Sequence, residues 1–149
     1  MALEVEIKLE PGQTEPKVVI LTETVTAEVA DLARRLSAGE VRFLPARREN
    51  GEIVLLEPGD IWRIYAQGQQ VLARTADDTL VLRSRLYELE ERLAGAGFLR
   101  VSHSELVNFN RVKSLDLSMA GTISLRLEGG DHAFVSRRCM GRIKQYLGI

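Results

Sequence analysis

Residues 61–83 read IWRIYAQGQQVLARTADDTLVLR, and this stretch decides the fold class. Three runs of Val, Ile, Leu, Thr and aromatic residues alternate with polar turns, at Gln67-Gly68-Gln69 and at Ala76-Asp77-Asp78. Turns this short join neighbouring antiparallel strands, because a parallel connection needs a dozen residues or more. The stretch therefore predicts a three-stranded meander.

Short strands continue on both sides of this meander, from about Asn50 to the C-terminus. One amphipathic helix interrupts them, since Leu86, Leu89 and Leu93 recur at helical spacing. So many strands with so few helices predict a mostly β fold, either a sandwich or an open barrel. Further strands are expected at residues 53–56, 98–101, 112–117, 123–127 and 132–135, with a turn at Met119-Ala120-Gly121 and a last helix at residues 142–147.

Residues 1–45 are predicted to form a small α+β extension, which places the main domain at residues 46–149. A unit this small has little core of its own. Dimerisation through the extension and packing onto the main domain are therefore equal alternatives. The elements expected in it are strands at Glu4–Leu9, Lys17–Leu21 and Val41–Leu44, and a helix that Thr26 caps.

Positive charge is concentrated in the last third of the chain. The net charge is −1, but residues 100–149 carry eight basic and four acidic side chains. Sixteen of the twenty basic residues are Arg, whose planar guanidinium group suits phosphates and base edges. This distribution fits a polyanionic partner, although ordinary surface ion pairs also explain it.

No pattern typical of catalysis or metal binding is recognisable in the sequence. His103 and His132 have no metal-ligand spacing with each other or with the single cysteine, Cys139. A Gly-rich phosphate loop, a nucleophile elbow and a closely spaced pair of catalytic carboxylates are also missing. We therefore expect no enzyme, no metal and no other cofactor. Cys139 is expected to be a small hydrophobic residue rather than a redox switch.

The sequence carries no recognisable export or membrane signal. One cysteine excludes an internal disulfide, and the longest apolar run, Val18 to Leu21, is far short of a membrane span. The acidic N-terminus lacks the basic and apolar regions of a secretory signal. We expect a soluble, cytoplasmic protein.

Several polar clusters in the last hundred residues carry Gln, His, Asn, Ser and Arg, the side chains that bind base edges and phosphates. Each cluster alone is more simply explained as a solvated loop. Together with the segments between them, from about Asn50 to Ile149, they resemble the LytTR family, the DNA-binding domain of many bacterial response regulators. The matching segments are Pro58-Gly59-Asp60-Ile61-Trp62, Gly68-Gln69-Gln70-Val71, Ser84-Arg85-Leu86-Tyr87-Glu88-Leu89-Glu90-Glu91, Phe98-Leu99-Arg100-Val101-Ser102-His103-Ser104, Leu106-Val107-Asn108 and Val135-Ser136-Arg137-Arg138.

This resemblance implies a β scaffold that places loops, instead of a recognition helix, into successive major grooves. The DNA contacts would come from a hairpin turn, from the loop after the Phe98 strand and from an Arg near the C-terminus. By number in this sequence, the implied DNA-binding residues are Gln69, Gln70, Ser102, His103, Arg137 and Arg138. Arg138 can bind guanine O6 and N7 bidentately, while Ser102 and Arg137 are expected to touch phosphates.

Other notable side chains are assigned structural roles. Asn108 is expected to satisfy backbone groups in its loop rather than read a base. Trp62, Tyr65 and Phe98 are assigned to the core because of their strand positions.

The leading interpretation is a sequence-specific transcriptional regulator that binds repeated half-sites on double-stranded DNA as a homodimer. The residues before Asn50 are too few for a receiver domain, and family members without one resemble small regulators set by a partner protein, in some cases membrane-bound. The alternative is a protein-interaction module that kept the scaffold and lost specific DNA binding. The acidic N-terminal extension suggests it, and so does an altered loop, because the family often has His-Arg-Ser where Ser102-His103-Ser104 stands. Glu105 also adds an acid beside that loop.

Overall fold

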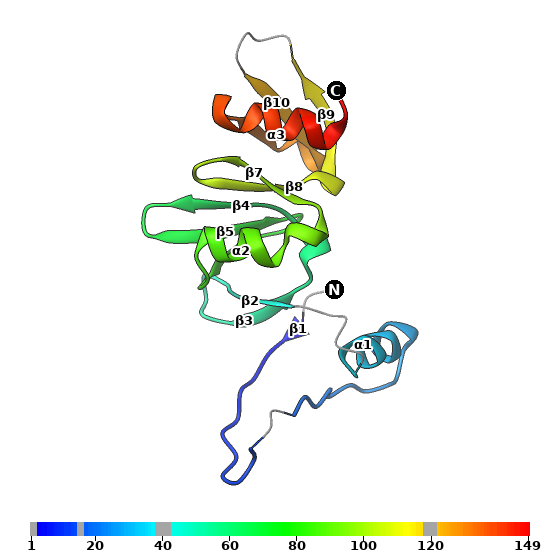
Figure 1. The fold of residues 1–149 in the computed structure, drawn as a ribbon. Helices are drawn as coiled ribbons and strands as arrows, with labels where there is room; N and C mark the ends of the chain where they lie inside the picture. The colour runs from blue at the N-terminus through cyan, green and yellow to red at the C-terminus, as the bar shows by residue number, and fades with distance from the viewer. Residues whose placement is uncertain (1–2, 15–16, 38–42, 118–121) are drawn as a thin grey trace.

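The computed structural model describes residues 3–14, 17–37, 43–117 and 122–149. An eight-stranded antiparallel sheet lies at its centre, with strand order β1-β3-β2-β6-β5-β4-β8-β7 (Figure 1). β4, β5 and β6 are consecutive neighbours, which confirms the predicted meander. The strands are β1 Leu3–Glu4, β2 Leu44–Arg47, β3 Ile53–Leu56, β4 Ile61–Gln67, β5 Gln70–Thr75, β6 Thr79–Leu82, β7 Phe98–Ser102 and β8 Glu105–Asn108.

A helix, α2 (Leu86–Arg92), covers one face of this sheet and closes the first core. Leu86, Leu89 and Leu93 are buried in that core, as their spacing predicts. The sheet contributes inward-facing residues from seven strands, β2 to β8, including Ile64 and Leu106, both fully buried.

A second, three-stranded sheet, with order β11-β10-β9, builds a second core together with α3 (Arg137–Leu147). Its strands are β9 Val112–Asp116, β10 Ile123–Leu127 and β11 His132–Val135. Alternate residues of β7 and β8 point to opposite faces, so Phe98 and Leu106 line the first core while Val101 and Val107 line the second. This strand pair therefore joins the two cores, and the mostly β prediction is confirmed.

The N-terminal extension differs from its prediction. Of the strands expected at Glu4–Leu9 and Lys17–Leu21, the structure forms only β1 (Leu3–Glu4), and residues 5–9 and 17–21 are neither strand nor helix. The physical reason is that no further strand of the described structure lies beside them: β3 ends opposite Val5, whose N–H donates to the Ile53 carbonyl at 3.2 Å. In Figure 1 these residues form a long limb that leaves the sheet and returns to α1.

The predicted helix is present as α1 (Ala27–Ser37). Thr26 caps it, because the Thr26 hydroxyl accepts a hydrogen bond from the Val29 N–H at 3.2 Å. An ion pair between Arg35 and Glu57, at 3.2 Å, links this helix to the main domain.

The expected boundary between residues 45 and 46 falls inside β2, which pairs with both β3 and β6. Of the strand expected at Val41–Leu44, only Leu44 is in β2, and Val41 and Arg42 lie outside the described residues, as does the turn expected at Met119-Ala120-Gly121. The last helix begins at Arg137, five residues earlier than expected. Cys139, Met140, Ile143 and Leu147 form its inward face, and Gly141 masks that periodicity in the sequence.

Candidate nucleic-acid interface

Three turns lie on the same side of the molecule: the β4–β5 turn, the β7–β8 turn and the first turn of α3, at the left of Figure 1. Backbone hydrogen bonds hold them in a row. The Ala66 N–H donates to the Ser104 carbonyl at 2.9 Å, and the Ser136 N–H donates to the Val101 carbonyl at 2.7 Å. We call this row the polar edge, residues 67–70, 102–104 and 136–138. It brings together all six site residues predicted from the sequence.

The β4–β5 turn presents two glutamines on a rigid hairpin. Gln67 pairs with Gln70, so the loop itself consists of Gly68 and Gln69. Gly68 has φ 62°, a value that its position in a two-residue hairpin turn requires and that other residues rarely adopt. Gln69 and Gln70 are exposed, and each amide can both donate and accept a hydrogen bond.

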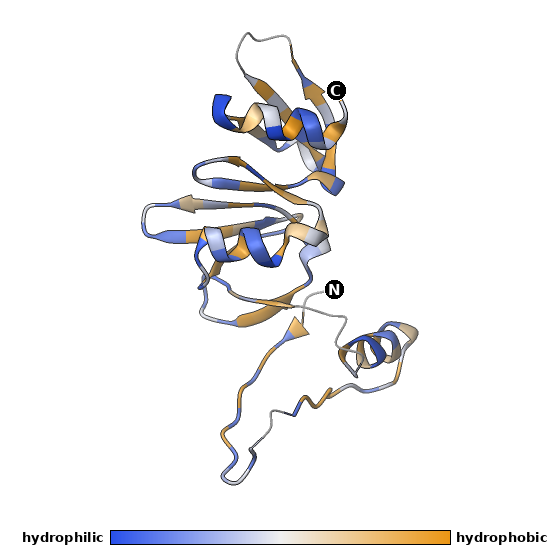
Figure 2. Cartoon of the chain, viewed as in Figure 1, coloured by the Kyte–Doolittle hydropathy of each residue, from blue (hydrophilic) through white to orange (hydrophobic). Residues whose placement is uncertain are grey.

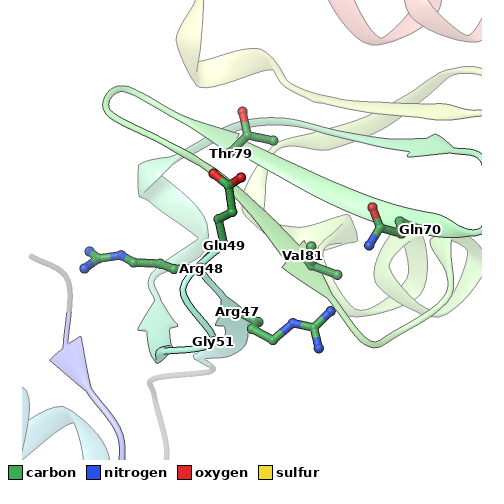
Figure 3. A pocket seen from close by; sticks show the side chains of 7 residues that line it. All are labelled: Arg47, Arg48, Glu49, Gly51, Gln70, Thr79 and Val81. Carbon is green, nitrogen blue, oxygen red and sulfur yellow. The ribbon is translucent and has the colours of Figure 1, made fainter.

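A hollow of about 410 Å³ lies beside this hairpin (Figure 3). Arg47 of β2 and Gln70 of β5 extend on either side of Val81, whereas Arg48 points away from Gln70. Arg47 is exposed, so it adds a positive charge next to a predicted DNA contact. Sequence reasoning missed Arg47 because its proximity to Gln70 depends on the non-local pairing of β2 with β6.

The β7–β8 turn exposes His103 on a loop whose backbone is fixed from within. The Arg100 guanidinium donates to the His103 carbonyl, and the Ser104 N–H donates to the Ser102 hydroxyl oxygen at 3.3 Å. Ser102 is half-buried, and its hydroxyl hydrogen is still available to a phosphate. The His103 imidazole itself points to solvent and has no hydrogen bond within the described structure.

Arg100 is a positioning residue that the sequence did not reveal. Glu90 of α2 lies 3.5 Å from Arg100 Nε and 3.8 Å from the Arg142 guanidinium of α3. Glu90 of α2 thus contacts both Arg100 and Arg142, and Arg100 in turn binds the β7–β8 turn. The spacing of these three residues in the chain gives no local signal of this contact.

Arg137 and Arg138 occupy the first turn of α3, after the N-cap Ser136. Both are exposed, neither forms an ion pair with another described residue, and that turn contains no acidic residue. The N-terminus of a helix carries partial positive charge and unpaired N–H groups, so two cations there destabilise the free helix. The same arrangement is favourable when an anion such as a phosphate binds.

Glu105, the acid beside the His103 loop, pairs with Arg63 of β4. Arg63 contacts Glu105 and Asp131 at 2.8 Å each, and its guanidinium lies 4.4 Å from the centre of the Tyr65 ring. Burial raises the pKa of Glu105, although the hydrogen bond and charge of Arg63 oppose that rise. Burial would lower the pKa of Arg63, but its hydrogen bonds to Asp131 and Glu105 outweigh burial and raise it. Arg63 therefore offsets part of the negative potential of Glu105, while its charge is shared with Asp131.

The structural roles assigned from the sequence are mostly confirmed. Asn108 is fully buried; its amide donates to the Ile61 carbonyl at 3.0 Å and its side-chain oxygen accepts from the Asn110 N–H at 3.0 Å. Trp62 and Phe98 are buried, and Cys139 packs half-buried against the second core. Tyr65 was wrongly assigned to the core: it is half-buried on the opposite face of the sheet, under Arg63.

Two further observations concern other kinds of site. Within the described ranges, no group of three or more His, Cys, Asp or Glu side chains is placed to hold a metal ion. No helix in that part of the chain combines the length and apolar character needed to cross a membrane.

Comparison with known proteins gives one consistent result. Residues 51–148 match the family described as the LytTr DNA-binding domain. Two proteins of Staphylococcus aureus, from strains NCTC 8325 / PS 47 and COL, are each 34% identical to this chain over 98 residues. Both are described as uncharacterized HTH-type transcriptional regulators, and the match covers 66% of this chain and 66% of each relative, so the chain spans about two thirds of their length. Among the described residues of the matched region, α2 and α3 are separated by five strands, and no helix-turn-helix unit is present there.

A solved structure shows the same fold. The LytTr DNA-binding domain of a protein from Bacillus cereus aligns with a TM-score of 0.67, over 72% of this chain and 97% of that one. Because the two are 20% identical in sequence, this likeness concerns the fold alone.

Proposed function

Because this chain belongs to the LytTr DNA-binding domain family, we propose that it is a sequence-specific transcriptional regulator that reads double-stranded DNA with its polar edge. The family is a DNA-binding family and not an enzyme family. The proposed base-reading residues are Gln69, Gln70, His103 and Arg138, with Ser102 and Arg137 on phosphates.

The observation that carries this proposal is the pair of exposed arginines at the N-terminus of α3, neither of which forms an ion pair within the described structure. Their positions cost stability in the free protein and gain it against a phosphate backbone. Two neighbouring turns with exposed amide and imidazole groups extend the same row, so phosphate attraction and base contacts come from one surface.

Arg138 is the residue from which the largest base discrimination is expected. A bidentate contact from Arg to guanine contributes about 1–3 kcal/mol of discrimination. Arg100 and Glu90 support the proposal by fixing the His103 loop, because a base contact requires a turn that keeps its geometry.

The proposal includes binding as a homodimer to two repeated half-sites, in the cytoplasm of a bacterium, where the DNA is. The family resemblance also predicts that a partner protein, membrane-bound in some cases, controls the activity of this regulator. This stays a prediction. When two copies of the chain bind one duplex through the same polar edge, the DNA site must contain two similar halves.

Selection of the purified protein against a random duplex library, at low and near-physiological salt, tests the proposal. A repeated motif enriched at both salt concentrations is the expected result. Enrichment at low salt alone would indicate phosphate attraction without base readout. No enrichment at either salt would contradict the proposal and favour the protein-interaction module.

A further inference from the structure

The N-terminal limb carries half of the exposed large hydrophobic residues of the described structure. We call residues 5–14 and 17–26 the N-terminal arm; Figure 2 shows its hydrophobic segments on a limb that stands away from the sheet. Six of the twelve exposed large hydrophobic residues in the described structure belong to it, with exposed fractions of 65–93%. They are Ile7, Leu9, Val18, Val19, Leu21 and Val25. So much exposed apolar surface in one segment marks an interaction site.

Residues 5–9 continue the alternation of β1 beyond the point where its neighbour ends. Leu3 lies opposite Leu55, and the Val5 N–H reaches the Ile53 carbonyl. After Val5, no strand among the described residues of the same chain lies alongside. By the two-residue period of extended chain, Ile7 and Leu9 can share the face of Leu3 and Val5. The segment has the pattern of a half-buried strand, and its edges are unpaired in the described structure.

The sequence of this segment is complementary to itself. In an antiparallel pair centred on Ile7, Val5 of one copy faces Leu9 of the other, and Glu6 faces Lys8, twice by symmetry. Glu6 and Lys8 are both exposed, 3.9 Å apart in the single chain.

Other registers of the same pairing lack this complementarity. Centring on Glu6 or on Lys8 puts like charges against each other on the axis. Centring on Val5 sets Glu4 against Glu6, and centring on Leu9 sets Ile7 against Pro11, which cannot donate to a ladder.

We propose that residues 5–9 of two copies of this chain pair as antiparallel strands about a twofold axis at Ile7. The binding partner of the exposed arm is thus the arm of a second copy of this chain. The resulting dimer is isologous, as a twofold interface must be. This inference deepens the proposed function, since it supplies the two copies that repeated half-sites require. Its evidence and its readout do not involve DNA.

Charge reversal on the full chain tests this register without DNA. Glu6→Lys sets two lysines against each other at both symmetric positions, and Lys8→Glu sets two glutamates there. Each single variant is expected to weaken dimerisation about tenfold, because two attractive pairs become repulsive. An equimolar mixture of the two single variants, or the double variant, is expected to restore it, since opposite charges then face each other again. Sedimentation velocity over a range of concentrations measures all four cases.

Disulfide trapping tests the position of the axis. In a Cys139→Ser background, Ile7→Cys is expected to form a covalent dimer on mild oxidation, because position 7 faces its own copy. Leu9→Cys is the matched control: the two copies of position 9 would lie roughly 13 Å apart, outside disulfide range.

Three results would overturn the proposal. These are a monomer at every concentration, a dimer that ignores both charge reversals, and equal cross-linking at positions 7 and 9. None of them would bear on DNA binding, which the duplex selection tests separately.

Discussion

Residues 4–9 and residues 61–65 are both predicted as strands, but the structure exposes the first segment and buries much of the second. Ile64 in the second segment is fully buried, whereas Leu9 in the first is 93% exposed. The difference lies in the neighbours: β4 is paired on both sides, by β5 and β8, while residues 5–9 extend past the end of β3. An alternating pattern therefore specifies a face that can be buried. Whether it is buried depends on which strands, of the same chain or of another, lie beside it.

The largest expected effect is a difference in the free energy of unfolding between a variant of the first core and a variant of the arm. Leu106→Ala, in the first core, is expected to lower the free energy of unfolding by about 2–5 kcal/mol, because it leaves a cavity between β8 and α2. Leu9→Ala is the matched control on the arm. In protein dilute enough to be monomeric, it should change stability by less than about 0.5 kcal/mol. Urea unfolding measures both, and equal losses would show that the arm packs within its own chain.

The next largest expected effect is on DNA affinity. It distinguishes the polar edge from other positively charged surface. Arg138→Ala is expected to weaken binding to the selected duplex by about 1–3 kcal/mol, and binding to random duplex by much less. Lys113→Ala removes an exposed positive charge from β9, outside the polar edge, and should weaken binding to the two duplexes similarly and slightly. Fluorescence anisotropy gives the four affinities. Equal losses from Arg138→Ala on both duplexes would contradict base reading by Arg138.

The parts of this fold that sequence analysis predicted are those with local signals. The meander, α2, the Thr26 cap and the hydrogen bond from the Asn110 N–H to the Asn108 side chain all depend on residues close together in the chain. All six site residues lie on one edge because each stands at the end of a predicted strand, although their contacts with DNA stay predictions.

The remaining features depend on long-range pairing that no local pattern reveals. Arg63 pairs with Glu105 from 42 residues away, and Arg47 approaches Gln70 only through the pairing of β2 with β6. Residues 17–21 have strand composition, but no strand lies beside them in the described structure. Their composition correctly indicates apolar side chains that can be buried against a partner. It wrongly predicts that these residues form a strand.

A smaller effect tests whether Arg47 belongs to the interface. Arg47→Ala is expected to weaken binding to specific and random duplex alike, by less than about 1 kcal/mol, and to reduce the salt dependence by about one phosphate contact. Lys17→Ala, on the arm but outside the proposed strand pair, serves as control and should leave the salt dependence unchanged. An unchanged salt dependence for Arg47→Ala would remove Arg47 from the interface.

The smallest expected effect is a pH dependence of the unfolding free energy that arises from Glu105. The pKa of Glu105 is raised above its ordinary value of 4.5, so the folded protein holds that proton more tightly than the unfolded chain. This contribution to stability is fully present below pH 4.5 and is lost as pH rises through the raised pKa. Unfolding free energies of the wild type, relative to Glu105→Gln, should therefore fall with rising pH in that window. An increase instead would mean that the charge of Arg63 outweighs burial.

The most direct test of the central claim is residue-level NMR of the full chain, titrated with the selected duplex. We predict that the largest amide shifts fall at residues 67–70, 102–104 and 136–138, the polar edge. The N-terminal arm should show small shifts, because its role is association between copies. Shifts concentrated on the arm or on β9, with the polar edge unchanged, would contradict the account.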